Sequence, residues 1–311
     1  MSKAIRDVYG ELLAEYGKIN KDVVVLDADV SSSTKTSIFA KECPDRFYNV
    51  GIAEQCMAGM AAGFAITGKI PFVNTFAAFI TTLCGLAARS VIGYSDLNVK
   101  LMGAYGGMSD AYDGATHHSN DDLSIMRTFP GYTVLVPSDA AITGWMIKTA
   151  IEYKGPMYIR LSRDSMPDIY KEDEEFEIGK SKIVHDGTDA TLIACGIMVG
   201  RGIEAARELA KEGISLRVVD MYSIKPLDSD MILKCADETG AVITAEEHTV
   251  LGGLGGAVSE TLALGRRGVP MEMLGINDVY TVTGAYDQLL CKYGLDVETV
   301  IESVKRVVAA K

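Results

Sequence analysis

The chain contains no pair of cysteines in a CxxC spacing. Its six cysteines are scattered, and most of them lie in apolar runs: Cys43, Cys56, Cys84, Cys195, Cys235 and Cys291. This pattern excludes a disulfide framework and predicts reduced, buried thiols. We therefore expect a cytoplasmic protein.

Long apolar runs are also missing. Residues 56–94 form the most apolar segment, but Lys69, Pro71 and Arg89 interrupt it. No stretch reaches the roughly 18 residues expected of a membrane-spanning helix. Residues 1–18 have the pattern of an amphipathic helix and lack the apolar core of a signal peptide. No membrane partner is expected.

Basic residues are fewer than acidic ones. The 30 Lys and Arg residues face 42 Asp and Glu residues, which gives a net charge of −12 and a pI of about 4.9. This balance excludes a nucleic-acid backbone or an anionic membrane as a general partner. Any anionic substrate must be held by a few local Arg, Lys or backbone N–H groups.

The remaining composition is that of a globular protein, and 311 residues are typical of two domains. Short apolar runs alternate with helical patterns in the first half. Strands are predicted at 22–30, 70–76, 97–103, 132–138 and 156–163, and helices at 3–17, 53–67, 78–93 and 139–153. This alternation predicts an α/β fold in which helices flank a mainly parallel sheet.

A change of composition divides the chain. Residues 168–180 are acidic and poor in apolar side chains, which indicates a surface linker. A second series then follows, with strands at 190–196, 215–221 and 241–247 and helices at 200–212, 227–238, 254–266 and 296–309. We predict two α/β domains, at 1–165 and 188–311, joined by a linker at 166–187.

One acid stands in an unusual setting. Glu54 begins a run, EQCMAGMAAGFA, that consists almost wholly of small and apolar residues. A solvated acid at a helix start is one interpretation, because it complements the helix dipole. A buried carboxylate with a raised pKa, suited to proton chemistry, is the other.

Two further clusters have candidate functions. The loop SDAYDGATHHSNDD, at 109–122, carries the adjacent His117 and His118, which are either a solvated pair or a source of acid–base groups. No further His or Cys at a suitable spacing suggests a metal site there. Phe76 and Phe79 share a helix face and form either core packing or a platform for a planar ring.

Together, these clusters resemble the C-terminal half of a transketolase. The resemblance rests on GIAEQ, TFAAF, DGATHH, LSRD and EEHTVLGGLGG, in this order, and it covers essentially the whole chain. It is strongest to the C-terminal subunit of the split transketolases. It implies a pyrimidine-binding domain for thiamine diphosphate, followed by a transketolase C-terminal domain.

The resemblance also implies the cofactor residues. Glu54 matches the carboxylate that hydrogen-bonds the cofactor's pyrimidine ring, so that the cofactor's own amino group removes the proton from its reactive carbon. Phe79 matches the aromatic ring that stacks on the pyrimidine, and Phe76 lies beside it. Asp29 matches an acid near the cofactor.

Substrate residues follow in the same way. His117 matches a histidine near the reacting carbonyl, and Asp113 matches an acid that binds a substrate hydroxyl. Arg163, Arg6 and Ser33 match groups that hold the sugar phosphate, a task for which an arginine fork is well suited.

Two positions depart from the family pattern. Tyr105 stands where a further phosphate-binding histidine is usual, and His118 replaces a common glutamine. In the family, the residues at both positions contact the substrate. The anionic end of the substrate could therefore be bound here by other groups than in the family, or it could be an anion other than phosphate.

The diphosphate site is missing. The family holds the diphosphate and Mg²⁺ with a GDG motif, and the chain contains no GDG. The resemblance therefore implies a separate N-terminal subunit that carries GDG and Mg²⁺, and no metal ligand in this chain. We expect an α2β2 assembly that is inactive without that subunit.

Three other functions remain open at this point. One is the β subunit of a 2-oxo-acid dehydrogenase, which has a similar size and domain order. Another is half of a 1-deoxyxylulose-phosphate synthase. The third is a scaffold or regulatory relative without catalytic activity, which the joint presence of Glu54, His117, Asp113 and Arg163 disfavours.

Overall fold

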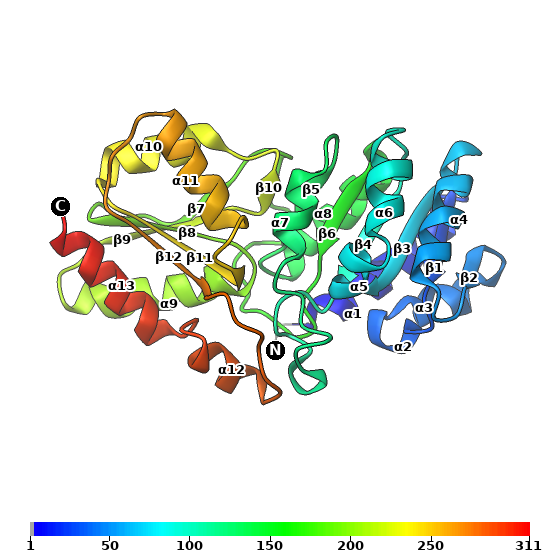
Figure 1. Ribbon diagram of the computed structural model, residues 1–311, viewed down its shortest axis with the longest axis horizontal. Coiled ribbons are helices and arrows are strands. Elements are labelled where there is room, and N and C mark those ends of the chain that lie inside the picture. Colours follow the sequence, from blue (N-terminus) through cyan, green and yellow to red (C-terminus); the bar gives the residue numbers. More distant parts are fainter. Residues whose placement is uncertain (1–2) are drawn as a thin grey trace.

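A computed structural model describes residues 3–311, which form two α/β domains lying side by side (Figure 1). Each domain is built on its own mainly parallel sheet with helices on both faces, as the sequence predicts. The first sheet has seven strands and the second has five. Within the described part of the chain, no helix is both long and apolar enough to cross a membrane.

The first sheet has the strand order β10-β5-β6-β4-β3-β1-β2. All neighbours are parallel except β10, which runs antiparallel to β5. Its central strands are buried along their whole length, which explains why they consist of continuous apolar runs. The strands are β1 Val23–Asp27, β2 Phe47–Asn49, β3 Ile70–Phe76, β4 Lys100–Ala104, β5 Thr133–Leu135, β6 Met157–Arg160 and β10 Ser223–Lys225.

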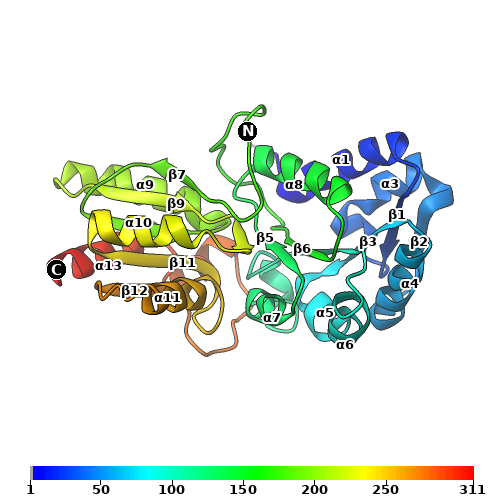
Figure 2. The same ribbon diagram turned by 90° about the horizontal axis from the view of Figure 1, so that it is seen from above.

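Two groups of helices cover this sheet (Figure 2). One face carries α1 Ile5–Ile19, α3 Thr36–Glu42 and α8 Ala140–Glu152. The other face carries α4 Glu54–Ile66, α5 Ala77–Thr82, α6 Gly85–Ala87 and α7 Asp122–Thr128. The short α2 Ser31–Thr34 follows β1. The helices α2, α3 and α7 were not predicted.

The prediction of one helix over 78–93 is wrong. The segment consists of α5, α6 and a wider π-helical turn at Ala88–Gly93. The side chain of Tyr132 donates a hydrogen bond to Ala88 O at 2.8 Å, so that this carbonyl is already engaged at the break. Side-chain insertion of this kind is a common cause of helix irregularity.

The second sheet has the order β12-β11-β8-β9-β7, with β7 antiparallel to β9. Helices α9 and α13 cover one face, and α10 and α11 cover the other (Figure 1). The strands are β7 Lys182–His185, β8 Ala190–Ala194, β9 Leu216–Asp220, β11 Val242–Thr249 and β12 Met271–Ile276. The helices are α9 Ile197–Lys211, α10 Ser229–Thr239, α11 Leu254–Leu264, α12 Tyr286–Lys292 and α13 Val297–Ala309.

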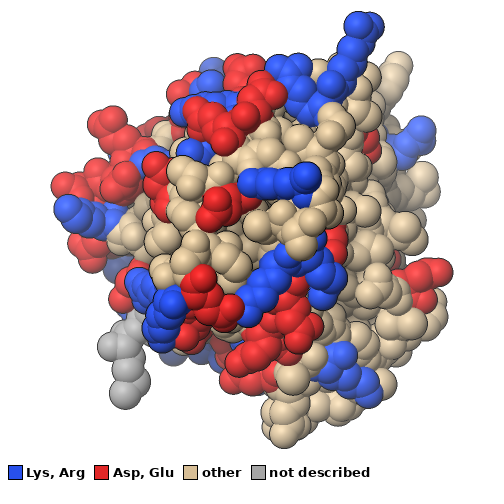
Figure 3. Space-filling view, turned by 90° about the vertical axis from the view of Figure 1, so that its left-hand side faces the viewer, with Lys and Arg blue, Asp and Glu red and all other residues tan. Residues whose placement is uncertain are grey.

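Charges of both signs alternate on the surface of the second domain (Figure 3). Several form pairs, such as Lys305 with Glu212 and Arg306 with Glu272. Exposed pairs of this kind contribute little to stability. They leave no broad basic surface on the face of the described chain that the figure shows, in keeping with the acidic composition.

Several elements escaped sequence prediction: β2, β7, β10, β12 and α12. Of these, β10 bears on the domain division, because it follows the predicted linker and yet belongs to the first sheet. The linker itself is partly anchored, since Phe176 packs against Trp145 with ring centroids 5.4 Å apart. The division at 165 and 188 stays a prediction.

The cysteines only partly match the expectation. Cys43, Cys84, Cys195 and Cys235 are buried, whereas Cys56 and Cys291 are exposed, and all six are free. Cys56 lies on α4, on the side that also carries the exposed Met60.

Candidate active site

The predicted site residues meet at one edge of the first sheet. Phe76 ends β3, and Tyr105 directly follows β4. Asp29 lies two residues after β1, and Arg163 three residues after β6. Because β1, β3, β4 and β6 are parallel, their carboxyl ends lie at the same edge, which is where open α/β sheets bind ligands.

Glu54 is the first residue of α4 and is 5% exposed, so the interpretation as a solvated acid is wrong. Among residues 3–311, its carboxylate has one hydrogen-bond contact, a long one from Thr75 Oγ1 to Oε1 at 3.5 Å. Its backbone carbonyl accepts from Cys84 Sγ at 3.1 Å. A buried acid with so little partnering requires a further group nearby.

An aromatic cluster lies next to Thr75. Phe76 stacks on Tyr105 with ring centroids 4.9 Å apart, and Phe79 lies 5.8 Å from Phe76. The His117 ring meets Phe79 edge-on at 5.2 Å. The sheet edge therefore brings together predicted cofactor and substrate side chains from segments far apart in sequence, and the Phe79 ring remains partly exposed.

Two arginines flank Tyr105. The Arg6 guanidinium donates a hydrogen bond to the Tyr105 hydroxyl, and the Arg163 guanidinium lies 5.4 Å from the Tyr105 ring centroid. The same hydroxyl donates to Ser33 O at 3.4 Å. Arg6, Arg163, Ser33 and Tyr105 thus form one contiguous group, with Tyr105 between the two cations.

Sequence reasoning missed Asp110, which belongs to this group. Its Oδ1 lies 3.5 Å from Arg163 Nη1, and its Oδ2 is buried without a hydrogen-bond partner among residues 3–311. Burial, and then the neighbouring Asp113 carboxylate, raise the pKa of Asp110 to about 7, while Arg163 and Arg6 oppose the rise. The acidic loop sequence gave no signal that one of its carboxylates would face the arginines.

The two histidines of the loop differ. His117 is partly exposed at the aromatic cluster, with Nδ1 3.0 Å from Thr116 Oγ1. His118 is buried, and its Nδ1 lies 2.7 Å from Thr281 Oγ1 of the second domain. Burial lowers the pKa of His118. His118 is therefore not part of a solvated pair, and it links the loop to the second domain.

Two predicted residues lie at the rim. Asp29 is exposed, has a positive φ of 65°, and accepts a hydrogen bond from Asn49 Nδ2 at 2.8 Å. Asp113 is also exposed and ends the short 3₁₀ turn Ala111–Asp113. Within the part of the chain that the structure describes, no group of three or more His, Cys, Asp or Glu side chains is arranged to hold a metal ion.

Comparison with known families decides the assignment. Residues 1–168 match the pyrimidine-binding domain of transketolase, and residues 179–300 match the transketolase C-terminal domain. The chain belongs to the transketolase family. The edge that carries Glu54 and Phe79 thus lies in the pyrimidine-binding domain of a transketolase.

Other transketolase chains match over nearly the full length. A putative transketolase C-terminal section from Methanocaldococcus jannaschii is 44% identical over 304 residues, which are 97% of this chain and 95% of the relative. One subunit of the apulose-4-phosphate transketolase of Phocaeicola vulgatus is 41% identical, with 97% and 98% covered. The solved split-gene transketolase, described as an inactive β4 tetramer, is 45% identical, with a TM-score of 0.90 and 99% of each chain covered.

Transketolases that consist of a single chain are about twice as long as this chain and match it over only about half of their length. Human transketolase is 37% identical over 306 residues, which are 97% of this chain but 48% of the human protein. The prediction of a C-terminal transketolase section is confirmed, in preference to a dehydrogenase β subunit or a synthase half.

Proposed function

We propose that this chain is the C-terminal subunit of a two-chain, thiamine-diphosphate-dependent transketolase, which moves a two-carbon ketol unit from a ketose to an aldose. The observation that carries the proposal is the buried Glu54 carboxylate, which has almost no partner in the described part of the chain and lies near the Phe76–Phe79 aromatic cluster. Similarity to transketolase subunits over nearly the whole chain supports it.

The residues present fit the pyrimidine half of the cofactor. Among residues 3–311 no group donates to Glu54 Oε2, which leaves an acceptor for a ring N–H, and the partly exposed Phe79 offers a face for stacking, with Phe76 beside it. When bound, thiamine diphosphate supplies a carbon nucleophile for the ketose carbonyl. The task of Glu54 is to hold a proton at the pyrimidine nitrogen, which a carboxylate shielded from water does well. Asp29, which follows β1 at the same sheet edge, would lie near the cofactor.

The substrate end is proposed to lie along the loop and the two arginines. His117 would bind or protonate oxygen at the reacting carbon, and Asp113 would accept a hydrogen bond from a sugar hydroxyl. Arg6 and Arg163, assisted by Ser33, would hold a terminal anion. A phosphate or another anionic group is compatible, and relatives are named as transketolases of apulose 4-phosphate and of 6-deoxy-6-sulfo-D-fructose.

The other half of the cofactor site is proposed to come from a second chain. The absence of a GDG motif supports placing the diphosphate and Mg²⁺ on an N-terminal subunit. We propose an α2β2 assembly in the cytoplasm, where six free thiols are stable.

Copurification with an N-terminal transketolase subunit, followed by a screen of ketose donors against aldehyde acceptors, tests the proposal. Ketol transfer that requires both chains and thiamine diphosphate is the expected result. A stable complex that turns over no ketose would instead support the scaffold alternative.

The isolated chain should bind thiamine diphosphate weakly, and Mg²⁺ should change the affinity little. The reason is that the strongest interactions, those of the diphosphate and its metal, belong to the partner. Isothermal titration calorimetry of the chain alone, with and without Mg²⁺, measures this. Tight, Mg²⁺-dependent binding would contradict the divided site, and the same titration of the complex serves as the positive control.

Replacing Gly63 with leucine should leave the isolated fold intact and disrupt assembly. Gly63 lies on the exposed side of α4, near Met60 and Ile66, where an added Cβ has no described atom of this chain within 4 Å. Leucine also favours a helix over glycine by about 1 kcal/mol. An apolar face of this kind is normally covered by another chain. Light scattering should show smaller species for Gly63→Leu.

Gly268→Leu is the matched control, because position 268 is equally open but lies in the second domain, away from this face. Equal assembly of Gly63→Leu and wild type would show that α4 faces solvent in the complex. A lower melting temperature of the isolated Gly63→Leu chain would point to a packing role instead.

A further inference from the structure

The loop 106–119 carries Asp110, Asp113 and His117, and we call it the substrate loop. Its two ends are joined by a pair of backbone hydrogen bonds, Gly107 N to Ser119 O and Ser119 N to Gly107 O, both 2.9 Å. The loop therefore has a narrow neck, and a shift of the neck would move the segment that carries the three side chains.

Glu247, in β11 of the second domain, binds this neck. Its Oε1 accepts a hydrogen bond from the backbone N–H of Met108 at 2.5 Å, and its Oε2 accepts from the Tyr286 hydroxyl at 2.8 Å. The side chain is 5% exposed, and burial raises its pKa to about 7. A buried carboxylate is costly, so a purely space-filling role would be better served by an apolar residue.

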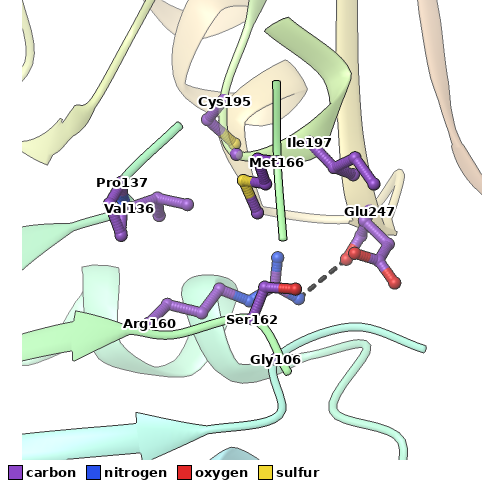
Figure 4. A pocket seen from close by; sticks show the side chains of 10 residues that line it. Gly106, Val136, Pro137, Arg160, Ser162, Met166, Cys195, Ile197 and Glu247 are labelled. Carbon is purple, nitrogen blue, oxygen red and sulfur yellow. Dashed lines mark hydrogen bonds between the residues drawn. The ribbon is translucent and has the colours of Figure 1, made fainter. Parts of the chain in front are cut away.

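Arg160, at the end of β6, completes the junction. Its Nη2 donates to Glu247 O at 2.7 Å and to Ser119 O at 3.0 Å, and its Nε donates to Asp122 Oδ2 at 2.9 Å. Figure 4 shows Arg160 of the first domain facing Glu247 of the second, with Gly106 below. The cavity at this junction, lined by Arg160 and Glu247 among others, is only about 10 Å³, too small for a ligand.

The two glycines of the neck allow this close approach. A side chain on Gly106 would overlap with Arg160, and one on Gly107, where φ is +67°, would overlap with Glu247. The C-terminal end of the loop, next to Ser119 of the neck, is held as well, by the contact of His118 with Thr281. The second domain thus contacts the substrate loop at both ends, and these contacts leave the side chains of Asp113 and His117 at the site.

We propose that Glu247 is a positioning residue, through which the C-terminal domain sets the geometry of the substrate loop and so controls substrate affinity without touching the substrate. This inference rests on the proposed function for the role of the loop in binding. The physical link itself, from Glu247 to the neck, does not depend on that function.

Hydrogen–deuterium exchange of the isolated full-length chain tests the link. Glu247→Ala should raise exchange in peptides covering 106–119, whereas Glu247→Gln, which keeps an acceptor for Met108 N–H, should not. Glu246→Ala is the matched control, because Glu246 is also buried on the same strand but accepts from Leu254 N and Gly255 N. It should loosen α11 and leave the loop protected.

Kinetics of the two-chain complex tests the consequence. Glu247→Ala should raise KM for the acceptor about tenfold or more with a much smaller change in kcat, the scale expected for losing a bond to a charged group. Glu247→Gln should restore KM to within about threefold of wild type. Tyr286→Phe, which removes the hydroxyl that donates to Glu247, should give a smaller rise in KM. It replaces Glu247→Ala as the test variant if Glu247→Ala does not fold.

Wild-type exchange of the loop in both Glu247→Ala and Tyr286→Phe would overturn the inference, and so would a loosened loop with unchanged KM. Failure of the wild-type complex to transfer a ketol unit would overturn the proposed function alone, because the exchange result is independent of turnover.

Discussion

Glu54→Gln should abolish ketol transfer while leaving the fold and partner binding intact. Glutamine has nearly the same shape, so the start of α4 and its packing should survive. Glutamine has no ionisable oxygen to place against the nitrogen of the cofactor ring, so the variant lacks the acid–base group. A positioned acid–base group typically contributes about 10²- to 10⁴-fold in rate. Steady-state turnover with saturating partner and cofactor measures the loss, and circular dichroism reports the fold.

The matched control is Glu298→Gln, the same change at an acid in the first turn of α13, far from the site. It should retain full activity. Wild-type turnover by Glu54→Gln would refute the catalytic role. An unfolded Glu54→Gln chain would show instead that the carboxylate is needed for stability, through Thr75 or the helix start.

The second large effect is expected at Arg163. Arg163→Ala should raise KM for phosphorylated acceptors with little change in kcat, because the arginine binds the anion alike in the ground and transition states. A lost charge-assisted bond of about 1.5–3 kcal/mol corresponds to roughly 10- to 150-fold in kcat/KM. Glycolaldehyde, which has no anion, should be affected far less.

Arg201→Ala is the control for a general charge effect, since Arg201 pairs with the exposed Asp287 in the second domain. Equal losses for glycolaldehyde and a phosphorylated acceptor in Arg163→Ala would mean that the arginine is structural, for example in holding Asp110. Tyr105→His in the same assay should shift preference toward ordinary sugar phosphates if Tyr105 sets specificity.

Much of the site follows from local sequence because strand ends are local features. Composition alone predicts the apolar runs that form β1, β3 and β4, and parallel strands bring their carboxyl ends to one edge. Glu54 was notable because an acid rarely begins a run of alanine, glycine and methionine. Its burial at 5% exposure agrees with that argument.

The rest depends on contacts between distant segments, which no local pattern encodes. Asp110 and Arg163 are separated by 53 positions and Met108 and Glu247 by 139, so neither pair leaves a sequence signal. The edge strand β12 alternates weakly and is partly exposed, and β10 has only three residues. Short or half-exposed strands acquire their conformation from their neighbours more than from their own residues.

The strand β10 has a consequence for how the chain is made. It covers the edge of β5, and an uncovered edge presents unpaired backbone groups to other chains. Roughly 90 residues separate Leu135 from Lys225, which at about 5–20 residues per second corresponds to a delay of roughly 5–20 s during translation. For that interval the nascent first sheet ends in an open strand, so the ribosome-bound intermediate is a natural client for chaperones, and it is completed only when the beginning of the second domain has emerged.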